Sequence, residues 1–301
     1  KPIPLTTQGG DPARIALGAQ LFRDTRLSAD GRTSCMTCHP LEHGGADRSV
    51  TPSFAGGWSR LRNTPTVFNS ALNMAYNWDG AFETVEEVIR SVMRNPLRMN
   101  TSPETAAQWL ERDDRYVERF RAAYPDGLTA ANLVDALAAY TRGLVTPNAR
   151  FDRYLRGERS VLTEQEQHGY ALFKAVGCVA CHQGVNVGGN LFQKFGVFRD
   201  TQAGAREEGA DPGRYLVTGR QQDFGVFRVP SLRNVALTAP YFHDGRSATL
   251  PDAVRTMARV QLDRELSDED VNAIVAFLGT LTGVFEASPG AYTPGPQQGG
   301  P

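Results

Sequence analysis

The sequence has no long hydrophobic run and almost no net charge. None of its apolar stretches approaches the ~20 residues that a membrane-spanning helix needs, so we expect no membrane span. The formal net charge is −1, which gives no reason to expect a nucleic-acid partner or an anionic membrane surface as a ligand. The chain opens on KPIPLTTQGG, which lacks the charged region and apolar run of a signal peptide.

Cysteine is also scarce, because 301 residues contain only four. The cysteines form two pairs with identical CxxC spacing, and a histidine follows each pair: Cys35, Cys38 and His39, then Cys178, Cys181 and His182. Two disulfides or one four-thiolate zinc site would use all four thiols, but neither explains the repeated histidine.

The pattern CxxCH is typical of covalent c-type heme attachment. The two cysteines form thioethers to the porphyrin, and the adjacent histidine ligates the iron. Two copies therefore predict two covalently bound hemes c. Since this attachment takes place outside the cytoplasm, we expect an exported, periplasmic protein whose numbering starts after a cleaved leader.

The chain also contains an internal repeat. Residues 65–80 read PTVFNSALNMAYNWDG and residues 230–245 read PSLRNVALTAPYFHDG, and a helix-like segment follows each. LGAQLF precedes CMTCH as GYALF precedes CVACH. Each half thus runs helix, CxxCH, long loop, Asp-Gly turn, helix.

The remaining pattern is mostly helical, so we expect an all-α fold. Apolar residues recur at helical spacing over residues 130–144 and 268–281, where Ser267 can cap and Gly283 can terminate the second helix. A capping box over residues 163–166 opens another helix. We predict domains at residues 1–159 and 160–287, followed by a disordered, low-complexity tail at 288–301.

One axial position remains to be assigned on each heme. Met257, on the helix expected after the second Asp-Gly turn, is the best candidate opposite His182. Methionine sulfur is a soft ligand that raises the reduction potential of heme iron, which suits electron storage. A core methionine on an amphipathic helix is the alternative.

Several segments resemble the bacterial di-heme cytochrome c peroxidases. They span roughly residues 14–283 and include GADRS (45–49), RNTPTVFN (62–69), NWDG (77–80), LVTPNARFDRYLRG (144–157), FGV (195–197) and FRVPSLRNVALTAPYFHDG (227–245). The resemblance implies two cytochrome c-like domains. It also implies a high-potential heme on His182 and Met257, and a low-potential peroxidatic heme on His39.

The same resemblance implies two further sites. A calcium ion lies between the domains of that family, and the residues that match its ligands are Asn63, Thr238 and Pro240. The family tryptophan between the hemes matches Trp78, whose alternative role is that of a buried core aromatic.

The peroxidatic pocket departs from the family pattern. A removable histidine, a glutamine and an acid/base glutamate are replaced here by Gly56, Val88 and Arg98, and the usual phenylalanine before the WDG turn is Asn77. Glycine cannot ligate iron, so we expect a heme that is open or closed by another residue. Arg98 cannot exchange a proton, since an arginine side chain stays protonated in proteins, but it can polarise the O–O bond of peroxide. A solvated surface position is its alternative.

Other residues could complete the pocket. Glu86 or Glu87 could supply a displaced base, or both could lie exposed on a helix. Met93 falls one residue beyond the position that matches Met257, so it could cap the first heme or belong to the core. We interpret three histidines as non-ligands: His43 in a loop, His168 at a helix start, and His243, expected to form a hydrogen bond near the second heme.

These observations predict a di-heme peroxidase-like oxidoreductase. It would reduce hydrogen peroxide or a related oxidant with electrons from a small cytochrome c or cupredoxin, and homodimers are common in the family. A non-catalytic electron carrier with a six-coordinate first heme is one alternative. An enzyme that oxidises a partner protein through high-valent iron, like the di-heme enzyme that matures methylamine dehydrogenase, is the other; that relative has tyrosine at the position of Met257.

Overall fold

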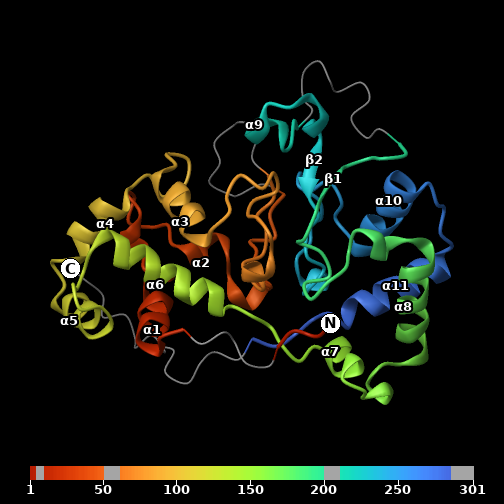
Figure 1. Cartoon of the computed structure of the whole chain (residues 1–301), viewed down its shortest axis with the longest axis horizontal. Helices are drawn as coiled ribbons and strands as arrows, with labels where there is room; N and C mark the ends of the chain where they lie inside the picture. Colours follow the sequence, from red (N-terminus) through yellow and green to blue (C-terminus); the bar gives the residue numbers. More distant parts are fainter. Residues whose placement is uncertain (5–9, 51–61, 200–210, 286–301) are drawn as a thin grey trace.

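The computed structural model describes residues 1–4, 10–50, 62–199 and 211–285, and its regular structure is almost entirely helical (Figure 1). The all-α expectation is confirmed, with a single two-stranded antiparallel ladder among the described residues. The elements are α1 (Pro12–Leu21), α2 (Cys35–Cys38), α3 (Val85–Arg94), α4 (Pro103–Leu110), α5 (Asp114–Ala123), α6 (Ala130–Gly143), α7 (Arg150–Leu155), α8 (Glu164–Val176), β1 (Phe192–Lys194), α9 (Tyr215–Thr218), β2 (Val226–Arg228), α10 (Leu250–Leu262) and α11 (Asp268–Gly279).

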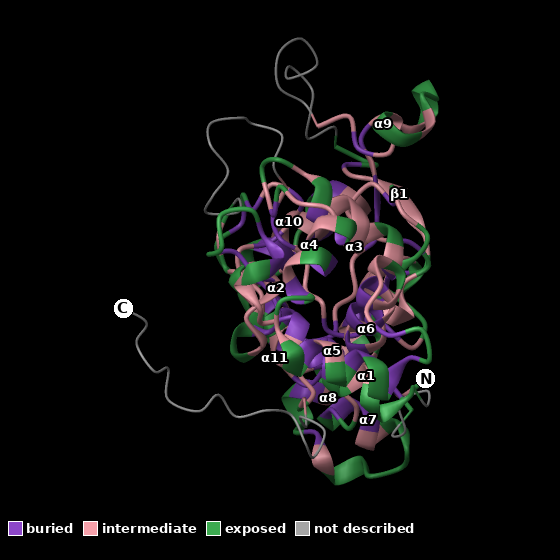
Figure 2. Ribbon diagram, turned by 90° about the vertical axis from the view of Figure 1, so that its left-hand side faces the viewer, coloured by how far each residue is buried: buried purple, intermediate pink, exposed green. Residues whose placement is uncertain are grey.

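The helices divide into two bodies, each around its own core. Helices α1 and α3–α6 surround one buried cluster, and α7, α8, α10 and α11 surround the other (Figure 1). In Figure 2 the buried segments lie along the inward faces of these helices. Phe151 of α7 belongs to the second core. The boundary near Arg159 stays a prediction, and the tail at 288–301 lies outside the described residues.

The local helix signals mostly hold. Thr163 and Glu166 form the expected capping box of α8, and Ser267 caps α11 through a hydrogen bond from the Asp270 amide. The last helix ends at Gly279 with Thr280 as its C-cap, so Gly283 is not its terminator.

The internal repeat is a repeat of structure. In each motif the backbone N–H of the histidine donates to the backbone carbonyl of the first cysteine. The distance is 2.9 Å from His39 to Cys35 and 3.0 Å from His182 to Cys178. Asn69 and Asn234 both have positive φ, at 58° and 60°, and each begins a short 3₁₀ turn, Ser70–Leu72 and Val235–Leu237. Asparagine suits this left-handed backbone better than most residues.

One glycine in each half allows two helices to cross in close contact. A Cβ on Gly18 of α1 would lie 2.0 Å from the carbonyl oxygen of Ala136 in α6, and one on Gly169 of α8 would lie 1.9 Å from that of Ala273 in α11. Both obstacles are backbone atoms, which cannot turn aside. These crossings hold the first helix of each half against its last.

We therefore expect Gly18→Ala and Gly169→Ala each to lower the free energy of unfolding by about 1–3 kcal/mol or more, because overpacking must displace a helix. Denaturant unfolding of the heme-loaded protein measures this. Gly143→Ala and Gly279→Ala are matched controls, since nothing lies within 4 Å of a Cβ at either position. Equal losses in all four variants would mean that the crossings are not tightly packed.

A single threonine joins the two halves of the repeat. Thr146 lies just after α6, and its Oγ1 accepts hydrogen bonds from the side-chain amides of Asn69 at 2.8 Å and Asn234 at 3.0 Å. Its backbone N–H donates to Asn69 Oδ1, while the N–H of Gly283 donates to Asn234 Oδ1. These hydrogen bonds therefore fix the position of one half of the repeat relative to the other.

A buried ion pair secures the second body. Arg233 contacts Asp152 of α7 at 2.8 Å, with side chains 1% and 0% exposed, and its Nε and Nη2 donate to the carbonyl of Val185. Asp152 also accepts the backbone N–H groups of Ala149 and Ile3. The pair ties α7 to the loop that follows CVACH.

Candidate functional site

The four cysteines are free thiols in two separate places. Cys35 and Cys38 lie in α2, whereas Cys178 begins the 3₁₀ turn Cys178–Ala180. Among the described residues no group of three or more His, Cys, Asp or Glu side chains could hold a metal ion, so a shared four-thiolate zinc site is wrong. Burial raises the pKa of Cys38 and of Cys178 to about 11, so these groups are thiols, the form that adds to a vinyl group.

The ring of His39 is oriented for an axial bond. Its Nδ1–H donates to the carbonyl of Gly45 at 3.0 Å, which leaves Nε2 as the free lone pair. Such a second hydrogen bond fixes the tautomer and the direction of a metal-bound imidazole. Removal from solvent lowers the pKa of His39 to about 4, so the ring is neutral at pH 7, as a ligand must be.

His182 is buried like His39, but among the described residues its ring lacks the equivalent hydrogen bond. Its Nδ1 is buried and has no hydrogen-bond partner by geometry within the described part of the chain, although the backbone of Val187 and Pro230 faces the ring. Burial lowers the pKa of His182 to about 4. Gly188 allows this approach, since a Cβ there would lie 2.1 Å from the carbonyl oxygen of Pro230.

Each CxxCH motif opens onto its own cavity. The first cavity has a volume of about 350 Å³ and includes Cys35, Cys38 and His39 in its wall; the second, of about 230 Å³, includes Cys178, Cys181 and His182. Anchoring thiols, a neutral imidazole and an adjoining cavity are what a covalently attached heme requires. The residues present in both halves fit that group.

The second cavity contains the expected sulfur ligand. Met257 of α10 lines it together with His182, from an element far along the chain. The neighbouring Gln261 binds the loop at residues 194–197. Its Oε1 accepts hydrogen bonds from the backbone N–H groups of Gly196 and Val197, and its Nε2 donates to the backbone carbonyl of Lys194. Met257 as the axial ligand stays a prediction.

We expect Met257→Leu to lower the midpoint potential of the second heme and to abolish the absorption of sulfur-ligated ferric heme, because leucine keeps the volume but offers no lone pair. Redox titration of the heme-loaded protein measures both. Met74→Leu is the control, since Met74 is exposed. An unchanged midpoint potential in Met257→Leu would mean that Met257 is a core residue and not a ligand.

The first cavity faces α3 and the loop that follows it. Val88, Ile89, Val92 and Met93 of α3 line it, followed by Arg98 and Met99. Because α3 repeats the position of α10, this wall corresponds to the one that carries Met257. Arg98 and Val88 both line this cavity, their roles stay predictions, and Gly56 lies outside the described residues.

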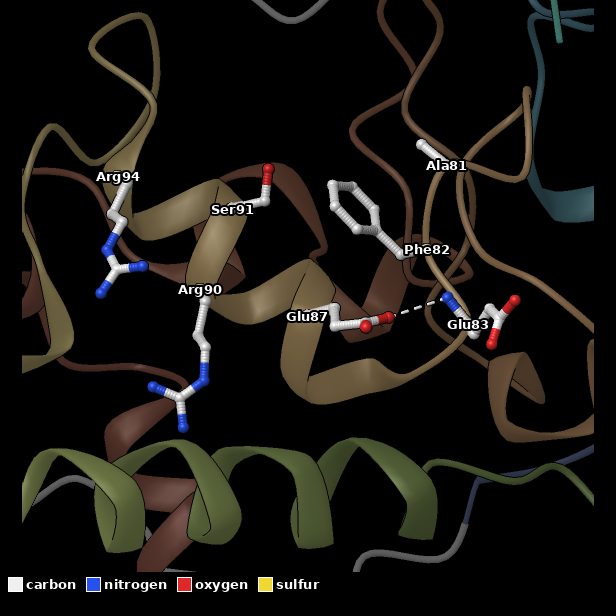
Figure 3. Close-up of a pocket in the computed structure, with 7 residues that line it drawn as sticks. All are labelled: Ala81, Phe82, Glu83, Glu87, Arg90, Ser91 and Arg94. Atoms are coloured by element: carbon white, nitrogen blue, oxygen red, sulfur yellow. Dashed lines mark hydrogen bonds between the residues drawn. The ribbon is translucent and has the colours of Figure 1, made fainter. Parts of the chain in front are cut away.

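Neither candidate for a displaced base reaches this cavity. Glu86 accepts from Arg142 at 2.6 Å, and Glu87 closes the capping box of α3 with Thr84. Figure 3 shows Glu87 beside Glu83, in a separate pocket that Arg90, Ser91 and Arg94 also line. Glu87 is exposed, as the alternative interpretation expects, whereas Glu86 is half-buried in its ion pair with Arg142.

Trp78 forms part of the wall of both cavities. Its Nε1 donates to the carbonyl of Asn63 at 2.8 Å, and Arg228 lines both cavities beside it. The backbone N–H of Arg228 donates to the carbonyl of Trp78 at 2.8 Å. This placement supports a position between two hemes, and its functional role stays a prediction.

The three calcium candidates gather around the second cavity, whose wall contains Asn63, Thr238 and Pro240. Asn63 donates its side-chain N–H to the carbonyl of Ser49, which leaves its amide oxygen free to accept or to coordinate. Carbonyl and amide oxygens suit calcium. The site stays a prediction.

The remaining candidates lie as follows. His43 and His168 are exposed, in agreement with non-ligand roles. His243 is buried in the second cavity, where its ring stacks on Phe227 at 4.0 Å and its Nε2 lies 4.0 Å from a carboxylate oxygen of Asp244; the hydrogen bond expected for it stays a prediction. Met93 is 1% exposed and packs in the first core.

Sequence reasoning missed two arginines. Arg62 pairs with Asp211 and Asp79 at 2.6 Å each, and Arg228 is buried with one N–H unpaired. Arg62 belongs to the motif RNTP and Arg228 to the motif FRVP. Neither motif predicts that the two arginines line the same cavity.

Among the described residues, none of the helices combines the length and the apolar character of a membrane span.

The sequence matches known proteins over most of its length. Residues 12–160 match the di-haem cytochrome c peroxidase family, and residues 166–282 match cytochrome c. The cytochrome c551 peroxidase of Nitrosomonas europaea is 43% identical over 281 residues, which are 93% of this chain and 82% of that protein. The cytochrome c551 peroxidase of Pseudomonas aeruginosa is 42% identical over 292 residues, 94% of this chain and 84% of that protein.

A solved structure agrees with these sequence matches. The crystal structure of a MauG-like protein associated with microbial copper homeostasis superposes with a TM-score of 0.81 at 28% identity, over 97% of this chain and 95% of that one. Two cavities built on CxxCH motifs, a helical fold repeated twice and relatives of this similarity lead to one assignment. The chain belongs to the di-haem cytochrome c peroxidase family, as an enzyme with two covalently attached hemes c.

Proposed function

We propose that the protein reduces hydrogen peroxide at the His39 heme with electrons that enter at the heme of His182 and Met257. The observation that carries this proposal is the shared wall: two cavities, each opening from its own CxxCH, meet at Trp78 and Arg228. The hydrogen bond from the Arg228 N–H to the Trp78 carbonyl, at 2.8 Å, links two residues of this shared wall and offers a route for electrons. Reduction of peroxide to two waters consumes two electrons and two protons, and two hemes can store the electrons.

The hemes, when bound, supply electron storage and the iron that binds peroxide. The chain supplies orientation and charge. The carbonyl of Gly45 holds the His39 ring, and Arg98 places a cation on the wall that corresponds to the Met257 side of the second cavity. A fixed cation in a pocket shielded from water can stabilise a departing hydroxide.

Partners and location follow from the same reasoning. Two relatives are named cytochrome c551 peroxidases, which supports a small cytochrome c as donor, with a cupredoxin as the other possibility. We propose a periplasmic location, a calcium ion at Asn63, Thr238 and Pro240, and a homodimer. A calcium requirement is tested by chelation followed by re-addition of the metal.

The proposal is tested by spectra and turnover of the heme-loaded protein. A high-spin ferric band that shifts on adding cyanide, together with peroxide-dependent oxidation of a reduced small cytochrome c, is the expected result. A wholly low-spin, cyanide-inert spectrum with no turnover would contradict it.

One observation favours a second candidate, a non-catalytic electron carrier. Met93 is fully buried and lines the first cavity, where its sulfur could occupy the sixth position. In that case Met93→Leu should open the heme to cyanide, whereas an already open heme should be unaffected by this substitution.

A further inference from the structure

The wall of the first cavity includes a residue of α9, which belongs to the second half of the chain. Leu216 lines this cavity, whereas the other described residues of the wall, apart from Arg228, lie between Phe22 and Thr141. Leu216 is also 54% exposed, so it lies where the cavity opens to solvent. An apolar side chain in contact with both the cavity and the solvent is in a position to limit what enters.

Backbone hydrogen bonds attach α9 firmly to β2. The N–H of Arg214 donates to the carbonyl of Val226 at 2.8 Å, and the N–H of Gly225 donates to the carbonyl of Pro212 at 2.9 Å. Gly213 has a φ of 59°, and a Cβ there would lie 2.3 Å from the carbonyl oxygen of Val226. Figure 1 shows α9 at the outer end of β2. The helix is therefore a fixed extension of the two-stranded ladder.

Arg214 also fastens α9 to the first half of the chain. Its Nη1 donates to the backbone carbonyls of Asp79 at 3.1 Å and Gly80 at 3.3 Å. Its guanidinium lies 3.9 Å from the centre of the Phe192 ring in β1. Leu216, two residues further along, is consequently held beside the Asp-Gly turn of the first half.

This turn leads into the wall at which we expect peroxide to react. Asn77 and Asp79 line the first cavity, and the chain then continues into α3. Arg98 follows α3 and lines the same cavity. Leu216 thus reaches the cavity beside the segment that carries these residues, although it comes from the other half of the repeat.

We propose that Leu216 limits the size of the molecule that enters the first cavity, so that hydrogen peroxide is admitted and a branched alkyl hydroperoxide is excluded. Leucine has no hydrogen-bond donor or acceptor in its side chain, so its effect is steric. The inference rests on the proposed function, because it names the substrate class of the same heme. Reduction of an alkyl hydroperoxide to an alcohol and water would consume the same two electrons and two protons, so the limit is one of size and not of chemistry.

The first experiment compares kcat/KM for tert-butyl hydroperoxide with kcat/KM for hydrogen peroxide in the heme-loaded protein. Leu216→Ala should raise this ratio about tenfold or more, the size expected when a few methylene groups are removed from a steric contact. Leu216→Phe should lower the ratio. Turnover of hydrogen peroxide should change little in Leu216→Ala. Ratios that stay the same in both variants would overturn the inference.

The second experiment measures ligand entry without turnover. Stopped-flow absorption follows the association of cyanide, a small ligand, and of imidazole, a bulky one, with the ferric heme-loaded protein. Leu216→Ala should accelerate imidazole association about tenfold and leave cyanide association unchanged, because only the bulky ligand meets the steric limit. Equal acceleration of both ligands would mean a general loosening of the cavity and would contradict a size limit.

Val217→Ala is the matched control. Val217 follows Leu216 on the same short helix and is 43% exposed, but it does not belong to the described wall of the cavity. Its substitution should leave the hydroperoxide ratio and the imidazole rate unchanged. An effect of Val217→Ala as large as that of Leu216→Ala would assign the change to α9 as a whole and overturn the role of the Leu216 side chain.

The two experiments separate this inference from the proposed function. Turnover of hydrogen peroxide with a selectivity that does not depend on Leu216 would overturn the size limit alone. Imidazole entry that depends on Leu216, without any peroxide turnover, would keep the size limit and overturn the peroxidase function. A first heme that binds neither cyanide nor imidazole in any variant would overturn both.

Discussion

Arg98→Gln is expected to reduce peroxide about 10²–10³ times more slowly than the unaltered protein, because removal of one preorganised donor costs about that factor in a pocket shielded from water. Glutamine keeps the approximate length and polarity of the side chain but removes the charge. Initial rates with excess reduced donor measure the change. Unchanged turnover would mean that Arg98 lines the cavity without taking part in the reaction.

Arg98→Glu separates charge from proton transfer. A glutamate at this position can move a proton between the two oxygens of peroxide, and positioned acid/base groups contribute ~10²–10⁴-fold. We therefore expect Arg98→Glu to exceed Arg98→Gln by at least about 10²-fold and to end at or above the unaltered protein. If Glu and Gln variants turn over equally, the missing acid/base group is not what limits the enzyme.

Arg233→Met is expected to lower the free energy of unfolding by about 3–5 kcal/mol, the largest stability effect among the pairs described here. The substitution leaves Asp152, which is fully buried, without its counter-charge. Denaturant unfolding of the heme-loaded protein measures the loss.

Arg153→Met is the exposed control for this ion pair. Arg153 and Glu158 form an ion pair with side chains 41% and 52% exposed, and such surface pairs contribute about 0–1 kcal/mol. Similar losses in Arg153→Met and Arg233→Met would contradict the special role of burial. The double variant Arg233→Met with Asp152→Asn should recover part of the loss, because no buried charge then remains unpaired.

Much of the molecule was readable from local sequence. CxxCH places ligand and anchors within five residues, helix caps depend on neighbours three positions apart, and a repeat needs only comparison of the chain with itself. The outward direction of Glu86 and Glu87 could also have been read, because α3 presents Val85, Val88, Ile89 and Val92 to the cavity on one helical stripe.

The rest depends on contacts between distant segments. The hydrogen bonds that join Thr146 to Asn69 and to Asn234 span 77 and 88 residues. Likewise, nothing local places Asn77 and Arg98 on one wall, or sets Arg62 between two aspartates. These contacts arise only when whole helices and loops pack together, and neighbouring residues in a single sequence do not predict that packing.

The link at Thr146 also requires the two halves of the repeat to differ at one pair of equivalent positions. Thr146 and Gly283 occupy equivalent places, since each donates its N–H to the asparagine of its own half. A Cβ on Gly283 would lie 2.2 Å from the carbonyl oxygen of Thr146. A residue with a side chain therefore does not fit at position 283 without displacing backbone. The second half thus needs glycine at the place where the first half carries the threonine that accepts hydrogen bonds from both asparagines.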